Sequence, residues 1–334
     1  MARNLQVTLA ARPVGEPQET DFALVEAEVP APGEGEVLVR NLWLSLDPYM
    51  RGRMSEARSY ARPVEIGEPM TAQAVGEVVE SRSPRFSPGD VVVGQFGWQE
   101  YAVAGAHHVR RVDPALAPVT TALHVLGMTG LTAYFGLFDV CRPLPGDTVV
   151  VSAASGAVGQ IVGQLARTAG CRTVGLAGSP EKVADLRELY GYDEGIDYRA
   201  EDLRDALKRT CPAGVDVYFD NVGGEVSNAV HRRLAQNARI AICGQIAEYN
   251  QVPPQGGPAS LSFMIVQRVR MEGFLVSDYA HEFEPALRRL AGWLGEGRLR
   301  YREDIVDGLE HAPRAFIGLL RGENRGKLLV KIAE

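Results

Sequence analysis

The chain has 334 residues, a formal net charge of −7, 46% hydrophobic residues and 23% charged residues. This balance is typical of a soluble globular protein, and the length allows two domains of ordinary size. It excludes nucleic-acid binding, because no basic run is present. It also excludes a membrane span, because the longest apolar runs are far too short.

The N-terminus and the cysteines indicate the compartment. The first residues show no apolar core followed by a cleavage site, so we expect no signal peptide. The four cysteines, Cys141, Cys171, Cys211 and Cys243, lie far apart and form no C-x-x-C pair. This pattern predicts free thiols in a cytoplasmic protein, not a disulfide framework or a zinc site.

Residues 1–126 are predicted to form a β-rich domain. Short apolar runs at Val37–Val39, Ala74–Val79 and Val91–Val93 are separated by proline and glycine turns. Many short strands of this kind favour a barrel-like or sandwich-like domain. The stretch Leu44–Met54 interrupts the pattern with a loop that carries an aromatic residue and two arginines.

Residues 127–295 are predicted to form an α/β domain with a doubly wound parallel sheet. A helical stretch at Leu123–Leu137 precedes a regular alternation of strands and helices, which favours parallel strands joined by helices. The predicted strands are Thr148–Val151, Thr173–Leu176, Gly195–Tyr198, Val215–Asp220, Arg239–Cys243 and Met271–Val276. The predicted helices between and after them are Pro180–Tyr190, Glu201–Arg209, Glu225–Leu234 and Glu284–Leu294.

Two further segments bear on this organisation. Residues 253–258 (PPQGGP) exclude a regular element and indicate a functional or mobile loop. The tail, residues 296–334, carries a strand near Tyr301–Val306, a helix near Pro313–Leu320 and a last strand at Lys327–Ile332. We expect this tail to complete the first domain, so that the α/β domain is an insertion.

A dinucleotide fingerprint stands at Thr148–Ala166. Ala154, Gly156 and Gly159 have the spacing A-x-G-x-x-G, after a buried apolar strand and before a helix. Small residues in this turn let backbone amides approach a pyrophosphate, which the helix N-terminus then stabilises. An ordinary strand–helix turn is the alternative, and the context favours the fingerprint.

The residues after the second strand of this domain favour NADPH over NADH. NAD-binding folds place an acidic residue there to hold the ribose hydroxyls, whereas this chain has Gly178. Ser179 and Pro180 begin a helix, which puts Lys182 in its first turn, where it suits the 2′-phosphate of NADPH. A solvated surface lysine is an equally good interpretation, and Glu181 argues against the phosphate site.

The chain resembles the medium-chain dehydrogenase/reductase superfamily, and within it the zinc-free enone reductases: prostaglandin reductases, the leukotriene hydroxydehydrogenase, plant double-bond reductases and curcumin reductase. The resemblance covers nearly the whole chain. Its motifs are LSLDPYMRGRM (44–54), LGMTGLTAYFGL (126–137), SAASGAVGQIVGQLA (152–166), GSPEKV (178–183), YFDNVGGE (218–225), ARIAICGQIAEYN (238–250) and GENRGK (322–327). The chain departs from the family at Thr129, where proline is usual, and residues 245–248 vary in the family.

The resemblance implies a GroES-like first domain, a Rossmann domain that binds NADPH, and a homodimer, which exposed strand edges also suggest. Tyr249 matches a tyrosine proposed to sit by the substrate carbonyl, and Tyr49 matches an aromatic residue of the substrate pocket. Met128 and Phe274 are further candidates to line that pocket. The implied cofactor contacts are Gly156, Ala157, Val158, Gly159, Lys182, Tyr198, Asn221, Cys243, Gly244, Ile246, Tyr249, Phe274, Leu275, Val276 and Asn324.

The expected chemistry follows from the missing zinc ligands. The first zinc ligand of the superfamily falls in residues 47–50, which offer neither thiol nor imidazole, so no metal is expected. Without a Lewis acid, a conjugated enone or enal is the better substrate: hydride adds to its β-carbon and the charge moves to the carbonyl oxygen. Tyr249 or the cofactor ribose would donate a hydrogen bond to that oxygen, although Tyr249 could equally be a packing residue.

Two other functions remain open at the level of the sequence. A quinone reductase of the same superfamily would use the same cofactor, although the forms YFDNVGGE and ICGQIAEYN argue against it. A protein that binds NADPH without turnover is the second alternative. In each case the expected partner is a small molecule, and the native substrate is not predicted.

Overall fold

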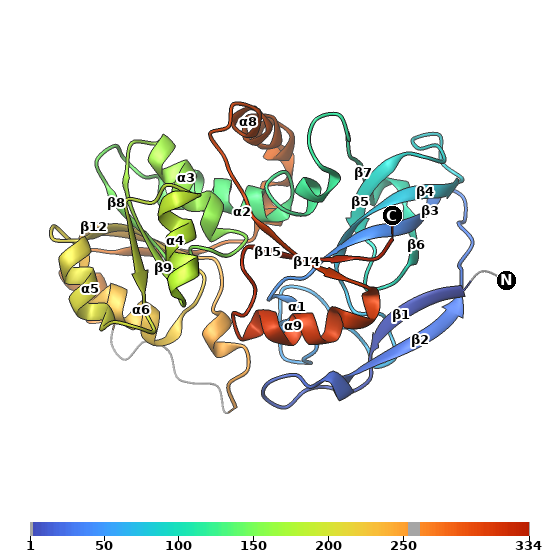
Figure 1. Ribbon diagram of the computed structural model, residues 1–334, viewed down its shortest axis with the longest axis horizontal. Coiled ribbons are helices and arrows are strands. Elements are labelled where there is room, and N and C mark those ends of the chain that lie inside the picture. Colours follow the sequence, from blue (N-terminus) through green and yellow to red (C-terminus); the bar gives the residue numbers. More distant parts are fainter. Residues whose placement is uncertain (1–2, 253–260, 334) are drawn as a thin grey trace. The chain divides into compact units, whose positions relative to one another are not determined.

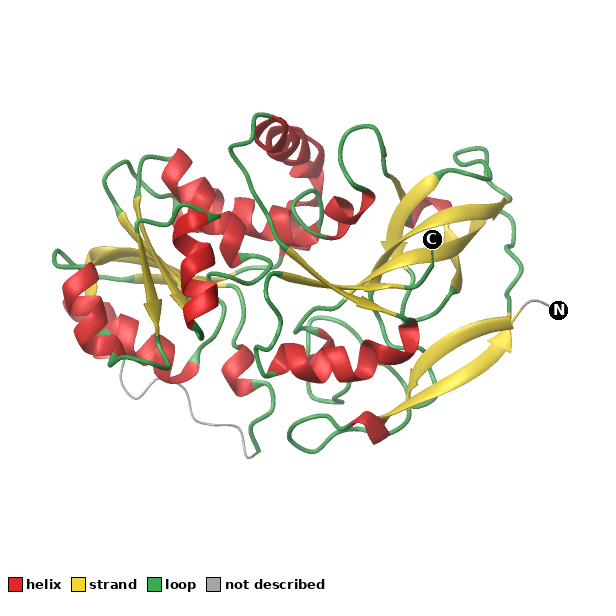
Figure 2. Ribbon diagram, in the orientation of Figure 1, coloured by secondary structure: helices red, strands yellow, loops and turns green. Residues whose placement is uncertain are grey.

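The computed structural model describes residues 3–252 and 261–333, so the predicted loop at 253–258 lies outside the described residues. The chain divides into two compact units, residues 1–124 with 303–334 and residues 125–302. The sequence-based boundaries were 126/127 and 295/296. Figure 1 colours the chain from its N-terminus to its C-terminus, and Figure 2 separates helices from strands. None of the described helices is long and apolar enough to cross a membrane.

The first unit is rich in β-strands, as predicted, and most of its strand pairs are antiparallel. Its main sheet has the order β14-β15-β3-β4-β5-β7, with β6 also paired to β3, and a separate hairpin joins β1 to β2. The strands are β1 (Arg3–Leu9), β2 (Phe22–Glu28), β3 (Glu36–Ser45), β4 (Gln73–Ser81), β5 (Val91–Gln95), β6 (Tyr101–Gly105), β7 (Arg110–Arg111), β14 (Glu303–Asp307) and β15 (Lys327–Lys331). Because β15 pairs with β3, the C-terminal tail completes this sheet.

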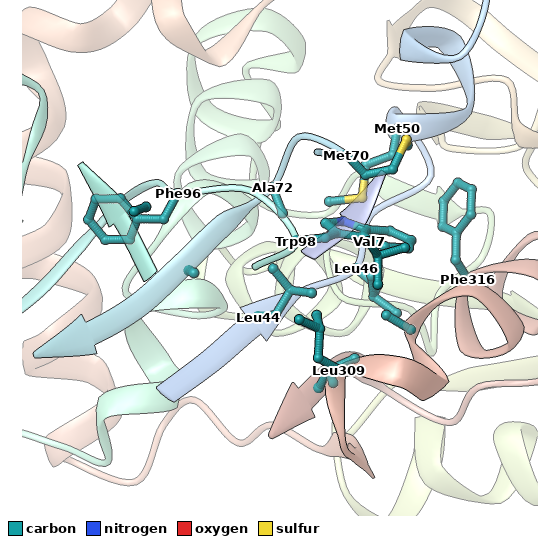
Figure 3. Packing of buried hydrophobic residues seen from close by; sticks show 14 of the residues in the cluster. Val7, Leu44, Leu46, Met50, Met70, Ala72, Phe96, Trp98, Leu309 and Phe316 are labelled. Carbon is teal, nitrogen blue, oxygen red and sulfur yellow. The ribbon is translucent and has the colours of Figure 1, made fainter. Parts of the chain in front are cut away.

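A buried hydrophobic core, in which a few aromatic rings pack among aliphatic side chains, holds the first unit together (Figure 3). The rings of Phe22 and Trp98 stack with centroids 5.6 Å apart, and Phe316 of helix α9 (Ala312–Leu320) meets Trp98 edge-on at 5.7 Å. Met50 is fully buried in the same cluster and opens the short helix α1 (Met50–Arg53). The core therefore anchors the helix that directly follows Tyr49, which the sequence analysis gave as a candidate for the substrate pocket.

The second unit contains the parallel sheet that the alternating pattern predicts. Its order is β10-β9-β8-β11-β12-β13, which numbered along the chain is the doubly wound order 3-2-1-4-5-6. The strands are β8 (Thr148–Val151), β9 (Arg172–Ala177), β10 (Glu194–Asp197), β11 (Val215–Asp220), β12 (Leu234–Ile242) and β13 (Arg270–Gly273). The order reverses between β8 and β11, and ligands of such sheets bind at the carboxyl ends of the strands near that point.

The helices of the second unit follow the predicted alternation. They are α2 (Met128–Phe135), α3 (Gly159–Thr168), α4 (Pro180–Glu188), α5 (Leu203–Thr210), α6 (Gly224–His231), α7 (Ser262–Val266) and α8 (Phe283–Gly295). The predicted helix at Leu123–Leu137 was wrong at its start, because a separate 3-10 turn occupies Val119–Leu123. Helix α2 then continues as a π-helical segment through Gly136–Cys141.

The strand predicted at Met271–Val276 is shorter than expected. It ends at Gly273, and a 3-10 segment begins at Val276. The ring of Phe274 meets Phe219 edge-on, with centroids 6.4 Å apart, and lies against Gly136. This packing draws the chain away from the sheet, which no local pattern could reveal.

Candidate active site

The fingerprint turn follows β8 at the point where the strand order reverses. Ala154 is fully buried, and its amide donates to the carbonyl of Leu176 in the neighbouring strand at 2.9 Å. A Cβ on Gly159 would lie 2.4 Å from the Ala153 carbonyl oxygen, so only glycine fits there. A Cβ on Gly156 would lie 3.1 Å from that same oxygen and 4.0 Å from the Ala153 Cβ. The turn is therefore a cradle of small residues at the N-terminus of α3, which fits a pyrophosphate.

Gly178 follows the carboxyl end of β9, where NAD-binding folds have an acid. A Cβ at this position would lie 2.8 Å from the Tyr198 hydroxyl oxygen, so a side chain there would require the Tyr198 ring to shift. Ser179 caps α4 by accepting the Lys182 amide at 3.3 Å, which confirms the predicted helix start. Lys182 is half-buried in the first turn of that helix.

Arg199 also lies at this end of β9, and the sequence reasoning missed it. Its Nε atom lies 3.2 Å from the Cβ that Gly178 lacks, and its guanidinium lies 5.9 Å from the Tyr198 ring centroid. The available signal was an arginine directly after Tyr198, a predicted cofactor contact. Two cationic residues, Lys182 and Arg199, thus lie near the carboxyl end of β9, which is not directly followed by an acidic residue.

Asp220, at the carboxyl end of β11, is the centre of a buried hydrogen-bond network that the sequence analysis also missed. It is 1% exposed. One carboxylate oxygen accepts the amides of Val222 and Gly223, both at 3.0 Å, and the other accepts the Ser227 hydroxyl at 2.6 Å. The Tyr218 hydroxyl donates at 2.9 Å to the same oxygen that accepts the two amides. Asp220 therefore fixes the loop that follows it.

The same network reaches the fingerprint and the end of β12. The Ser152 hydroxyl donates to Asp220 at 3.2 Å, and the Asn221 side chain donates to the Ser152 carbonyl at 2.7 Å. The amides of Cys243 and Gly244 donate to the Asp220 carbonyl at 2.8 and 3.1 Å. Three strand ends that carry predicted cofactor contacts are thus held to one another.

Cys243 has the properties of a packing residue. Burial raises the pKa of its thiol to about 12, so the thiol stays protonated and is a poor nucleophile at neutral pH. All four cysteines are free thiols, which confirms the expectation from their spacing.

Tyr249 follows the 3-10 turn Ile246–Glu248 and is half-buried. Its hydroxyl oxygen accepts the Gln245 amide at 3.4 Å and lies 3.3 Å from the Cβ that Gly244 lacks. The ring therefore folds back over its own loop. Among the other predicted residues of this unit, Met128 is half-buried at the start of α2, and Leu275 and Val276 follow β13.

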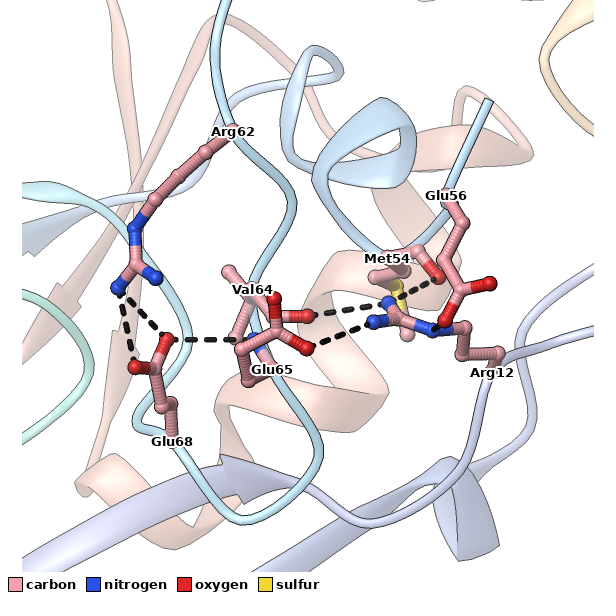
Figure 4. Close-up of polar contacts among 7 residues, drawn as sticks. All are labelled: Arg12, Met54, Glu56, Arg62, Val64, Glu65 and Glu68. Carbon is pink, nitrogen blue, oxygen red and sulfur yellow. Dashed lines mark hydrogen bonds and ion pairs between the residues drawn. The ribbon is translucent and has the colours of Figure 1, made fainter. Parts of the chain in front are cut away.

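In the first unit, arginines fix the segment around Tyr49. The buried Arg51 donates to the Gly15 carbonyl at 2.8 Å, and the buried Arg53 donates to the Ala61 carbonyl at 3.1 Å. Arg12 bonds the carbonyls of Met54 and Val64 at 3.3 and 3.0 Å (Figure 4). The arginines that sequence reasoning noticed in this stretch therefore serve the loop itself.

Tyr49 is half-buried against the core of the first unit. Burial raises the pKa of its hydroxyl, and the nearby Asp47 carboxylate raises it further. Tyr49 is therefore neutral at any physiological pH. Asn324, the remaining predicted contact, lies in the turn before β15, where its side chain donates to the Gly326 carbonyl at 2.7 Å.

The donor set at residues 47–50 does not fit a zinc ion. Asp47 bonds Lys327 at 2.6 Å and also accepts the Ser45 hydroxyl, and Tyr49 and Met50 supply no thiolate or imidazole. Within residues 3–252 and 261–333, no three His, Cys, Asp or Glu side chains gather in a way that could hold a metal ion.

The structure gathers the predicted cofactor residues of the second unit at one edge of its sheet. The fingerprint follows β8, Lys182 and Tyr198 lie at the ends of β9 and β10, Asn221 follows β11, and the segments after β12 and β13 carry the rest. Tyr49 and Asn324 belong to the first unit.

Comparisons with known proteins agree with this architecture. Residues 5–112 match a family described as the N-terminal domain of oxidoreductase, and residues 157–292 match a family described as zinc-binding dehydrogenase. The NADPH-dependent curcumin reductase of Escherichia coli is 44% identical over 336 residues, covering 99% of this chain and 97% of that protein. The NADP-dependent 2-alkenal reductase of Nicotiana tabacum is 43% identical over 337 residues, covering 99% and 98%.

A solved structure is similarly close. CurA from Vibrio vulnificus in complex with NADPH superposes with a TM-score of 0.95 at 44% identity and covers 100% of both chains. Identity of this extent over whole chains, with the fingerprint and the doubly wound sheet in place, decides the family. The chain belongs to the medium-chain dehydrogenase/reductase superfamily and, within it, to the NADPH-dependent enone reductases related to curcumin reductase.

Proposed function

We propose that this protein reduces the carbon–carbon double bond of α,β-unsaturated ketones and aldehydes with NADPH. The observation that carries the proposal is the 43–44% identity, over nearly the whole chain, to reductases of 2-alkenals and of curcumin. We also propose a cytoplasmic homodimer. The edge strands of the parallel sheet, β10 and β13, offer pairing surfaces for a second copy.

The residues that would hold NADPH are those at the carboxyl edge of the parallel sheet, together with Asn324. The fingerprint turn fits the pyrophosphate, and Lys182 with Arg199 fits the 2′-phosphate. When bound, NADPH supplies a hydride to the β-carbon of the substrate. The absence of an acid after β9 supports NADPH over NADH, because a carboxylate there would repel the phosphate.

The chain's own contribution to the chemistry is polarisation of the substrate carbonyl. As hydride reaches the β-carbon, negative charge develops on the carbonyl oxygen, and a hydroxyl placed there stabilises it by hydrogen bonding. Tyr249 is the proposed donor. The α-carbon then takes a proton, for which solvent is the proposed source. Tyr49, Met128 and Phe274 are proposed to line a flat apolar substrate, and the packing of Phe274 on Phe219 makes that wall rigid.

Removing the cations near Gly178 is expected to change cofactor choice. The variants Lys182→Ala and Arg199→Ala each lack one charge-assisted hydrogen bond to the 2′-phosphate. The Kd for NADPH is therefore expected to rise about 10- to 100-fold for each substitution. The Kd for NADH, which lacks that phosphate, changes little. Fluorescence titration with both cofactors measures the difference, and Lys208→Met, an exposed lysine elsewhere, is the control. Equal weakening of both cofactors would contradict the assignment.

The function itself is tested by NADPH oxidation with enals, enones and quinones of graded size. We expect turnover of enals and enones, and Tyr249→Phe lowers kcat about 10- to 100-fold with little change in the Kd for NADPH. Unchanged turnover in Tyr249→Phe would reduce that residue to shaping the pocket. Turnover of quinones alone would identify a quinone reductase. Tight NADPH binding without any oxidation would identify a non-catalytic protein.

A further inference from the structure

A buried lysine joins the two parts of the first unit that carry predicted site residues. Lys327 is 1% exposed, and its Nζ atom lies 2.6 Å from Asp47 Oδ1 and 2.9 Å from the Leu46 carbonyl oxygen. Asp47 is 5% exposed and also accepts the Ser45 hydroxyl. All of the bonds described for this ammonium go to residues that lie 280 or 281 positions away in the sequence.

The position of each partner gives this ion pair its meaning. Asp47 begins the turn that leads into α1: its carbonyl accepts the Met50 amide at 3.1 Å, and Tyr49 lies between them. Lys327 begins β15, three residues after Asn324. The pair therefore connects the turn that carries Tyr49 to the turn that carries Asn324.

Stability alone does not account for a charged pair in this place. Taking two charges out of water costs several kcal/mol each, and a buried ion pair is often no more stabilising than an apolar pair of the same volume. The strands that flank it already pair through Leu329 with Ser45 and Val330 with Leu44, so the sheet does not need it. The ion pair instead fixes the orientation of the turn, because Nζ bonds both a backbone carbonyl and a carboxylate of that turn.

We propose that Lys327 is a positioning residue. It acts through Asp47 to hold the turn with Tyr49 at a fixed position relative to the turn with Asn324. This inference rests on the proposed function, in which Tyr49 contacts the substrate and Asn324 contacts NADPH. Glu303 lies beside Lys327 on the parallel strand β14 and provides the matched control. Burial raises the pKa of its carboxyl, and Oε1 has no hydrogen-bond partner among the described residues.

Hydrogen exchange of the ligand-free protein tests the positioning directly. In Lys327→Met, peptides that cover residues 46–54 are expected to exchange at least about tenfold faster, while peptides of the second unit keep the parent's rates. Glu303→Gln leaves residues 46–54 at the parent's rates, and Lys327→Arg, which keeps a cation and donors, recovers most of the protection. Parent-like protection of residues 46–54 in Lys327→Met would overturn the proposal.

A double variant separates a loss of positioning from a general loss of stability. Asp47→Asn with Lys327→Met removes both charges of the ion pair, so its melting temperature returns toward the parent's. The turn still lacks its ammonium, so residues 46–54 are expected to remain fast in exchange. Recovery of both melting temperature and protection in this variant would mean that Lys327 contributes stability only, and the proposal fails.

Kinetics show whether the positioning serves catalysis. Lys327→Met is expected to lower kcat/KM for an enone about 10- to 100-fold. Combined with Tyr49→Ala or Asn324→Ala, it lowers kcat/KM by less than the product of the single effects, because the residues act through one arrangement. Fully multiplicative effects would contradict the proposal. If the parent reduces no enone, the proposed function fails, while the exchange experiment still decides the role of Lys327.

Discussion

Replacing Asp220 with alanine is expected to lower the melting temperature by about 10 °C and to weaken NADPH binding more than tenfold. The carboxylate accepts bonds from two backbone amides and from the hydroxyls of Ser152, Tyr218 and Ser227. Removing it leaves buried donors without a partner, which costs about 3–5 kcal/mol in total. It also releases the loop with Asn221 and loosens the fingerprint through Ser152.

Two other substitutions sharpen this expectation. Asp220→Asn should lower the melting temperature and the NADPH affinity less than Asp220→Ala does. Its amide oxygen can accept the hydrogen bonds that Oδ1 accepts, and its NH2 group can donate to the Ser227 hydroxyl oxygen. Asp216→Ala is the control at the opposite end of β11, where the carboxylate accepts only the Thr148 amide, at 2.9 Å, among the bonds described. We expect it to cost about 1 kcal/mol and to leave NADPH binding unchanged. Thermal unfolding and fluorescence titration measure both quantities, and equal effects of Asp216→Ala and Asp220→Ala would refute the network's role.

The second large effect is expected at the two fingerprint glycines, which should respond differently to the same change. In Gly159→Ala the new methyl group meets backbone atoms, the Ala153 carbonyl oxygen at 2.4 Å and the Ala154 Cα at 2.6 Å. The turn has to rearrange, so we expect a loss of about 3 kcal/mol in unfolding free energy and of at least about 100-fold in NADPH affinity.

Gly156→Ala should separate binding from stability. Its methyl group meets the Ala153 carbonyl oxygen at 3.1 Å and the Ala153 Cβ at 4.0 Å, which is a milder contact than at Gly159, so we expect a much smaller change in melting temperature. The same methyl group stands where the backbone has to approach the pyrophosphate, so NADPH affinity still falls. Gly292→Ala on α8, where the methyl group meets nothing within 4 Å, is the control and should stabilise slightly. Unimpaired NADPH binding in Gly156→Ala would place the pyrophosphate elsewhere.

Much of the fold follows from local pattern. Apolar runs and turn residues predict the strands of both units, and the alternation of strands and helices predicts the parallel sheet. The fingerprint was also recognisable, because Ala154, Gly156 and Gly159 act within one turn. The errors lie where packing decides an element's end, as at Phe274, whose contact with Gly136 and Phe219 ends β13 before Val276.

The sequence by itself therefore indicated the family, through motifs spread along the whole chain, and it also predicted the cofactor fold and the lack of zinc ligands at residues 47–50, because each of these two depends on residue types within a few positions of one another. Only the tertiary structure placed the Tyr198 hydroxyl beside Gly178, 2.8 Å from the Cβ that the glycine lacks. It alone revealed Asp220 and Lys327, whose partners lie up to 68 and 281 positions away. A buried charge is recognisable as functional only through the atoms that satisfy it, and those atoms meet when the chain folds.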